Sequence, residues 1–167
     1  MALVRTALSA PAVTSFNSLA NSPVAVASSA AITVGTSTNV ADHSVVVTIT
    51  GAASMTASAT TAVYLYLYTS EDGTLWGGSN TTNELIDGTD KAITWSANGN
   101  QGIPIGTILF TTTTAVASIV YKSKRISIAA ALGGTMPAKY VIVPQNQSGA
   151  AFAASGHSIS VTELSYS

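Results

Sequence analysis

Eight consecutive residues near the middle of the chain alternate between two kinds of side chain. In residues 62–69, Ala-Val-Tyr-Leu-Tyr-Leu-Tyr-Thr, the aliphatic residues Val63, Leu65 and Leu67 have one parity and three tyrosines have the other. Because successive side chains of an extended chain point to opposite faces, this pattern predicts a β-strand. Neither face is polar, so we expect a central strand that is covered, at least partly, on both sides. A layered β-structure must therefore surround it.

Shorter segments with the same period and many β-branched residues extend this prediction over most of the chain. We expect further strands at 24–34, 44–50, 92–96, 107–113, 117–121, 139–144 and 157–164. Asp-Gly, Asn-Gly and Gly-Gly dipeptides mark turns between several of them. Residues 126–134 fit either a strand edge or one turn of helix ended by Gly133. Seven or eight short strands predict an all-β fold, a single antiparallel β-sandwich of jelly-roll or immunoglobulin-like type.

Residues 1–23 differ from the rest of the chain in being rich in Ala, Ser and Asn, with Pro11 and Pro23 as breaks. We expect an extended N-terminal arm here, with one helical turn near its start, and a β-sandwich domain at 24–167. Because its apolar side chains are sparse, such an arm can bury little surface by folding on itself. It can bury more by lying along a groove of a partner, where the contacts offset the entropy cost of ordering it. The single Arg5 and the early Pro11 fit a cleaved signal peptide poorly, so we expect the segment to be retained.

Charged residues make up only 8% of the 167 residues, against about 25% in an ordinary soluble domain. Four long stretches contain no Asp, Glu, Lys or Arg: 6–41, 43–70, 92–121 and 140–162. Interface cores are depleted of charge because a buried, unpaired charge loses its hydration. The depletion favours a subunit covered by neighbours. A monomer with a surface of Ser and Thr, of which there are 22 and 23, stays open as the alternative.

Residues that could carry catalysis or bind metals are few. The chain has no cysteine, no Gly-x-Ser-x-Gly motif and only two histidines, His43 and His157, so we expect no enzyme and no cofactor. The acidic residues of 71–90 follow no Asp-x-Asp-x-Asp-Gly spacing. We interpret them as turn formers, because Asp bonds to its own backbone in turns. Cation binding by this loop stays open as a minor hypothesis.

Neither nucleic acid nor membrane is an expected partner. The net charge is −1, and the only basic cluster is Lys122, Lys124 and Arg125, which is too small for a nucleic-acid footprint. Strand geometry puts the two lysines on one face and Arg125 on the other. No stretch offers the roughly 20 apolar residues of a membrane-spanning helix.

Exposed aromatic side chains on a β-sandwich can stack on sugars, and Trp76, Trp95 and the row Tyr64, Tyr66 and Tyr68 are the candidates. Packing within the fold or at an interface explains the same residues more simply. We therefore keep carbohydrate binding as the alternative function.

The order of several segments resembles that of small structural proteins of tailed-bacteriophage virions. The segments are Ala27–Ile32, Val63–Gly73, Tyr121–Lys124, Ala129–Pro137 and Val143–Gly149. Within them, an aromatic strand is followed by Ser-x-Asp-Gly, and an Asn-x-Ser-Gly turn lies near the end. The resemblance implies a non-enzymatic β-sandwich that decorates or cements a capsid or builds a neck, collar or tail.

We therefore predict a structural subunit located in the virion, which packs as an oligomer with other copies of itself and with capsid, portal or tail proteins. The carbohydrate-binding alternative would belong to a tail or receptor-binding apparatus. Contacts are expected from the arm and the long loop, through Leu3, Leu8, Val13, Phe16, Leu19, Leu75, Trp76 and Ile86.

Overall fold

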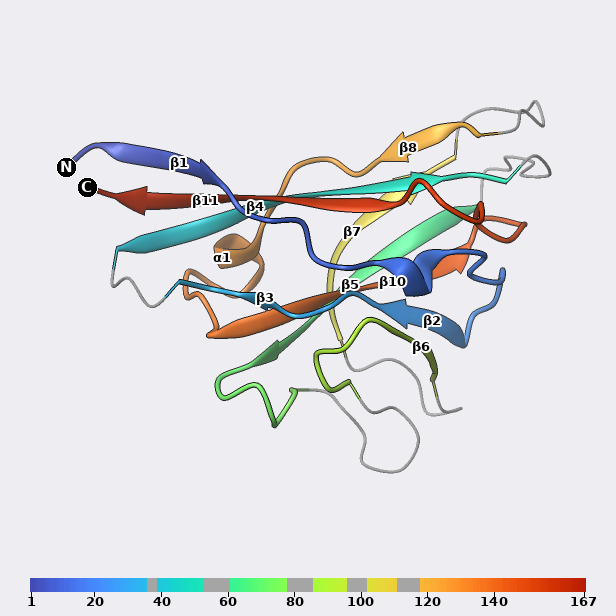
Figure 1. The fold of residues 1–167 in the computed structure, drawn as a ribbon, viewed down its shortest axis with the longest axis horizontal. Helices are drawn as coiled ribbons and strands as arrows, with labels where there is room; N and C mark the ends of the chain where they lie inside the picture. The colour runs from blue at the N-terminus through green and yellow to red at the C-terminus, as the bar shows by residue number, and fades with distance from the viewer. Residues whose placement is uncertain (36–38, 53–60, 78–85, 96–101, 111–117) are drawn as a thin grey trace.

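The computed structural model describes residues 1–35, 39–52, 61–77, 86–95, 102–110 and 118–167. They form two antiparallel sheets packed face to face (Figure 1), which confirms the predicted all-β sandwich. Sheet A has the order β1-β11-β4-β8, with β9 also beside β4, and sheet B has the order β6-β2-β10-β5-β7, with β3 also beside β10.

The bounds of the strands are as follows. Sheet A contains β1 (Leu3–Ala7), β4 (Val40–Thr50), β8 (Val120–Lys122), β9 (Ile126–Ser127) and β11 (Ser158–Tyr166). Sheet B contains β2 (Ala25–Ser28), β3 (Ile32–Thr33), β5 (Ala62–Ser70), β6 (Lys91–Thr94), β7 (Ile103–Leu109) and β10 (Lys139–Gln147). The described residues thus form eleven strands, more than the seven or eight predicted, because several are very short.

Strand β5 carries both cores of the molecule. Its aliphatic face, with Val63, Leu65 and Leu67, packs in the main core between the two sheets. Its tyrosine face contributes Tyr68 and part of Tyr66 to a second apolar cluster on the outer side of sheet B. The prediction that this strand is central and covered on both sides is therefore confirmed.

Strand β10 is the centre of sheet B and is buried along nearly its whole length. It extends beyond the predicted end at 144 although Pro144 lacks a backbone donor. Residues 24–34, predicted as one strand, form β2 and β3, and between them the Ser29 hydroxyl accepts a hydrogen bond from the Ile142 amide. The pairing of Gln145 with Val26 continues beyond Pro144, so the sheet accommodates the missing N–H at this position.

Two other segments resolve open or shifted predictions. Residues 126–134 contain both elements considered: β9, then the single turn α1 (Ile128–Ala131), whose first turn is capped by the Ser127 hydroxyl. Gly133 follows with a positive φ of 74°, the backbone geometry that ends a helix. Strand β7 begins four residues earlier than the predicted 107–113, of which 111–113 lie outside the described residues.

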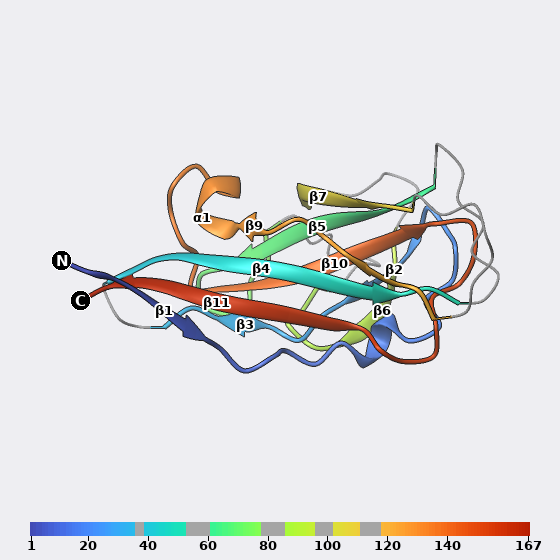
Figure 2. The same cartoon turned by 90° about the horizontal axis from the view of Figure 1, so that it is seen from above.

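The N-terminal segment is part of the sandwich. Residues Leu3–Ala7 pair along their length with β11, so the termini lie side by side at one end of the molecule (Figure 2). The helical turn expected near the start is instead the 3-10 turn η1 (Thr14–Phe16). The few apolar residues of this segment are enough to hold it against the sandwich, because Phe16 and Leu19 pack in the main core.

Candidate functional site

Four of the eight predicted interface residues lie inside the fold. Phe16 and Leu19 belong to the main core, and Trp76 and Ile86 to the cluster outside sheet B, each with no more than 7% of its surface exposed. They are therefore corrected from contact residues to core residues. The sequence could not separate the two roles, since both need apolar side chains.

The other four predicted contact residues keep some exposure. Leu8 and Val13 are half-buried against the main core. Leu3 is 50% exposed and Leu75 is 78% exposed. Only these last two present most of a large apolar side chain to the outside.

The edge of sheet A at β1 is the most exposed strand that the structure describes. All five of its residues are exposed, Val4 to 40%, and Tyr166 opposite Leu3 is 47% exposed. One side of β1 is bonded to β11, and no described residue pairs with its other side. Sequence reasoning missed Val4 and Tyr166, because their proximity depends on the pairing of β1 with β11, which joins the two ends of the chain.

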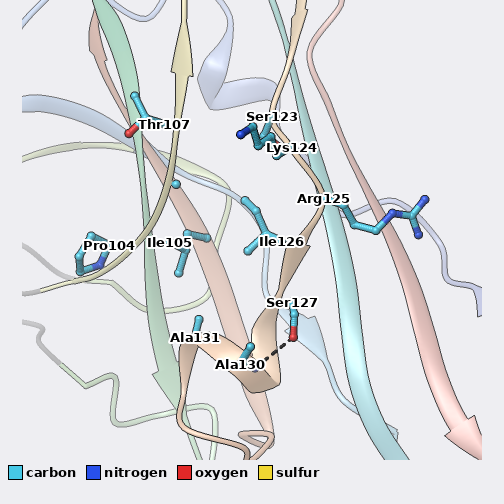
Figure 3. Close-up of a pocket in the computed structure, with 11 residues that line it drawn as sticks. Pro104, Ile105, Thr107, Ser123, Lys124, Arg125, Ile126, Ser127, Ala130 and Ala131 are labelled. Atoms are coloured by element: carbon cyan, nitrogen blue, oxygen red, sulfur yellow. Dashed lines mark hydrogen bonds between the residues drawn. The ribbon is translucent and has the colours of Figure 1, made fainter.

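A groove of about 430 Å³ runs along the opposite edge of the sandwich (Figure 3). One wall is β7 and the other is the segment from Ser123 to Ser127, with α1 at one end. Its apolar end holds Ile105, Ile126 and Ala131, and its polar end holds Thr107, Ser123 and Lys124. The lining residues are Pro104, Ile105, Gly106, Thr107, Ser123, Lys124, Arg125, Ile126, Ser127, Ala130 and Ala131.

The basic cluster predicted from the sequence lies around this groove. Lys124 is exposed beside it, whereas Arg125 points away across β4 and reaches the Ser44 hydroxyl, 3.4 Å away (Figure 3). Lys122 pairs with Thr48 of β4. In the described part of the chain none of these three cations has a carboxylate partner.

A polar cluster joins the two sheets inside the sandwich. His43 of β4 is fully buried; its Nδ1 lies 2.9 Å from the hydroxyl of Tyr140 on β10, and its Nε2 lies 3.5 Å from Glu163 on β11. The Tyr140 hydroxyl can donate to Nδ1 while the Nε2–H faces the carboxylate, which describes a neutral imidazole. Burial lowers the pKa of His43, against the opposing effects of Glu163 and Asp42.

Both histidines bond to other segments of the fold. The Tyr140 hydroxyl beside His43 has a raised pKa because it is buried, so it is a poor nucleophile. The Nε2 of His157 bonds to the carbonyl of Ala153, and its Nδ1 accepts from the Thr50 amide. Both rings are thus used to connect segments of the fold.

Two acidic residues of the long loop, Asp72 and Asp87, close local turns, whereas Asp90 accepts hydrogen bonds from the amides of Thr14 and Ser15 in η1. Asp72 accepts hydrogen bonds from the amides of Leu75 and Thr74, which hold the pKa of its carboxyl well below the usual value. Partial burial alone would raise the pKa of Asp87, but hydrogen bonds from Lys91 and Thr89 lower it to about 2. Among the described residues no three potential metal ligands gather at one point; Glu84 lies outside them.

The aromatic residues considered for sugar binding pack within the fold. Trp76 and Trp95 are buried in the cluster outside sheet B, where Tyr66 meets Trp95 edge to face at 5.2 Å. Tyr68 is 1% exposed, and Tyr64 and Tyr66 are half-buried. The two tryptophans and Tyr68 therefore do not present a flat exposed ring on which a sugar could stack.

Comparison of the chain with protein-family models, with curated proteins and with solved structures gave no match. In the part of the chain that the structure describes, no helix has the length and apolar character needed to cross a membrane.

Proposed function

We propose that the chain is a non-enzymatic structural subunit that assembles with other copies of itself and with other proteins of a bacteriophage particle. The observation that carries this proposal is β1, an edge strand exposed on both faces and bearing Leu3 and Val4 beside Tyr166. An exposed apolar edge is a liability in a monomer, because it invites pairing with another chain. A neighbouring subunit would cover it.

The geometry of β1 suggests how two copies would pair. An antiparallel pairing centred on Arg5 would place two guanidinium groups opposite each other, which is unfavourable. A pairing centred on Val4 instead places Val4 opposite its copy and Arg5 opposite Leu3. Such a contact repeats the same patch on both subunits, as two-fold symmetry requires, and makes the two copies of sheet A continuous.

Light scattering during size-exclusion chromatography of the full chain tests this contact. Wild-type protein should associate as its concentration rises, and Val4→Lys should abolish association, because the pairing would bring two lysines together. The matched control is Val24→Lys, since Val24 is 41% exposed and Val4 is 40% exposed. A wild type that stays monomeric at every concentration, or a Val4→Lys variant that associates normally, would contradict the proposal.

The virion location needs its own measurement. Purified phage particles carrying the gene for this chain should contain the protein in many copies by quantitative mass spectrometry, and particles whose copy carries Val4→Lys should contain far less. Carbohydrate binding remains the alternative, with less support because Trp76 and Trp95 are buried.

A further inference from the structure

The groove beside β7 lies at the edge of the sandwich opposite β1. A protein bound there would not touch the β1 surface proposed for self-association. Strand β7 is the last strand of sheet B, and no described residue pairs with its outer side. About half of the backbone groups of such an edge point outward without a strand partner. Six of its seven residues are not buried, although the strand carries no charge.

The usable part of this edge is short. Pro104 has no N–H to donate, and the pairing with β5 shifts between Leu65 and Tyr66, which leaves Ile105 as an extra residue. A bulge and a proline both interrupt pairing. Residues 106–109 remain as the regular segment on which another strand could add.

The groove itself discriminates between side chains. At Gly106 the two walls come close, since a Cβ there would lie 3.5 Å from Cδ1 of Ile126. A bound side chain that lies beside Ile105 and Ile126 would contact apolar atoms. A bound side chain farther along the groove, toward Thr107, would lie near Lys124 (Figure 3). Residues two apart on a strand share a face, so the groove suits an apolar side chain followed or preceded at that spacing by a carboxylate.

From this geometry we infer that the groove binds a short extended segment of a different protein, which adds to β7 and combines apolar with acidic side chains. Among the described residues, no strand of a second copy fits. In the described strands carboxylates occur only at Asp42 in β4 and Glu163 in β11. Both strands are already paired on their two sides, so neither can be offered to a neighbour. The outward N–H and C=O groups and the apolar floor favour a peptide over a nucleic acid, which has little use for either.

Fluorescence anisotropy with the full chain tests the inference. The probe is a labelled eight-residue peptide of repeating Val-Val-Glu-Glu, in which valine and glutamate stand two residues apart and so share a face. The comparison probes carry glutamine for glutamate, carry N-methyl groups on alternate amides, or are a single-stranded oligonucleotide. The glutamate peptide should bind, with affinity that falls as salt rises. N-methylation along one edge should abolish binding, because it removes the donors of strand addition.

The variant Lys124→Glu should weaken binding of the glutamate peptide by about tenfold or more, as expected when one cation of a charge pair is reversed. Lys91→Glu, which reverses a cation on β6 at the other edge of sheet B, should leave the affinity unchanged. Equal binding of the glutamine peptide, tighter binding of the oligonucleotide, or no binding up to about 1 mM peptide would overturn the inference. None of these results depends on association through β1, which is followed separately by light scattering.

Discussion

Replacement of Phe16 by alanine tests whether the N-terminal segment is part of the core or only an arm that reaches a partner. Phe16 is fully buried in the main core. Truncation of a buried Phe to Ala costs about 3–5 kcal/mol, and the cost is larger where the surroundings cannot collapse into the cavity. The backbone around it is fixed, because the Ser18 amide bonds to Ala153 and the Phe152 amide bonds to Leu19. We therefore expect the upper half of that range.

The measurement is urea and thermal unfolding of the full chain at low concentration, followed by circular dichroism. With about 2.1 cal/mol/K of unfolding entropy per residue, the 167 residues give about 0.35 kcal/mol/K, so a loss of about 4 kcal/mol lowers Tm by roughly 11 °C. Leu75→Ala is the control; its side chain is 78% exposed, and we expect a change within about 0.5 kcal/mol. A loss below about 1 kcal/mol for Phe16→Ala would refute the assignment of this residue to the core.

Three further outcomes are expected. Asp90→Asn should lower the free energy of unfolding by about 1 kcal/mol at neutral pH, because the Asp90 carboxylate accepts hydrogen bonds from the first amides of η1. Partial burial would raise the pKa of Asp90, but its hydrogen bonds outweigh that effect and lower it. Urea titrations should therefore show the stability difference between wild type and variant shrinking as pH falls below 3.8. Burial lowers the pKa of His43, so on acidification His43 is protonated in the unfolded chain before it is protonated in the folded protein. The free energy of unfolding therefore falls as pH drops below 6.5. Between about pH 7.5 and about pH 5.5 the His43→Gln variant should lose less stability than wild type, and an equal loss would exclude His43 as the cause. Gly88→Ala should lower Tm more than Gly133→Ala, since both have positive φ but only at Gly88 would a Cβ meet Trp76, at 2.7 Å; equal melting temperatures would contradict this.

The strand pattern of this fold is readable from the sequence where both faces of a strand are buried. The two faces of β5 differ in chemistry, aliphatic against aromatic, and each faces its own cluster. The sequence of such a strand therefore indicates both that the segment is extended and that its two faces are buried. Strand β10 could be placed for the same reason, although its continuation beyond Pro144 follows from pairing with β2 and β5 that only the tertiary structure shows.

The candidate sites were harder to foresee because they depend on pairing between distant residues. Nothing local in Leu3–Ala7 indicates that it lies along β11, more than 150 residues away. The same holds for the groove, whose walls come from β7 and from the segment before α1. The one local signal was the basic cluster at 122–125, of which Lys124 and Arg125 line the groove.

The scarcity of charge has two physical causes in this molecule, and they carry different weight as signs of a partner. Over β10, within the charge-free stretch 140–162, the chain itself explains the composition, because the strand is buried on both faces. Over β7, within the charge-free stretch 92–121, it does not, because six of the seven residues are not buried and Leu109 is exposed. Strand β1 carries Arg5 but also exposes Leu3 and Val4. A free surface normally carries interspersed charge. The argument for neighbouring proteins therefore belongs to the two lateral edges alone, and substitutions there should change association while leaving the stability of the sandwich unaltered.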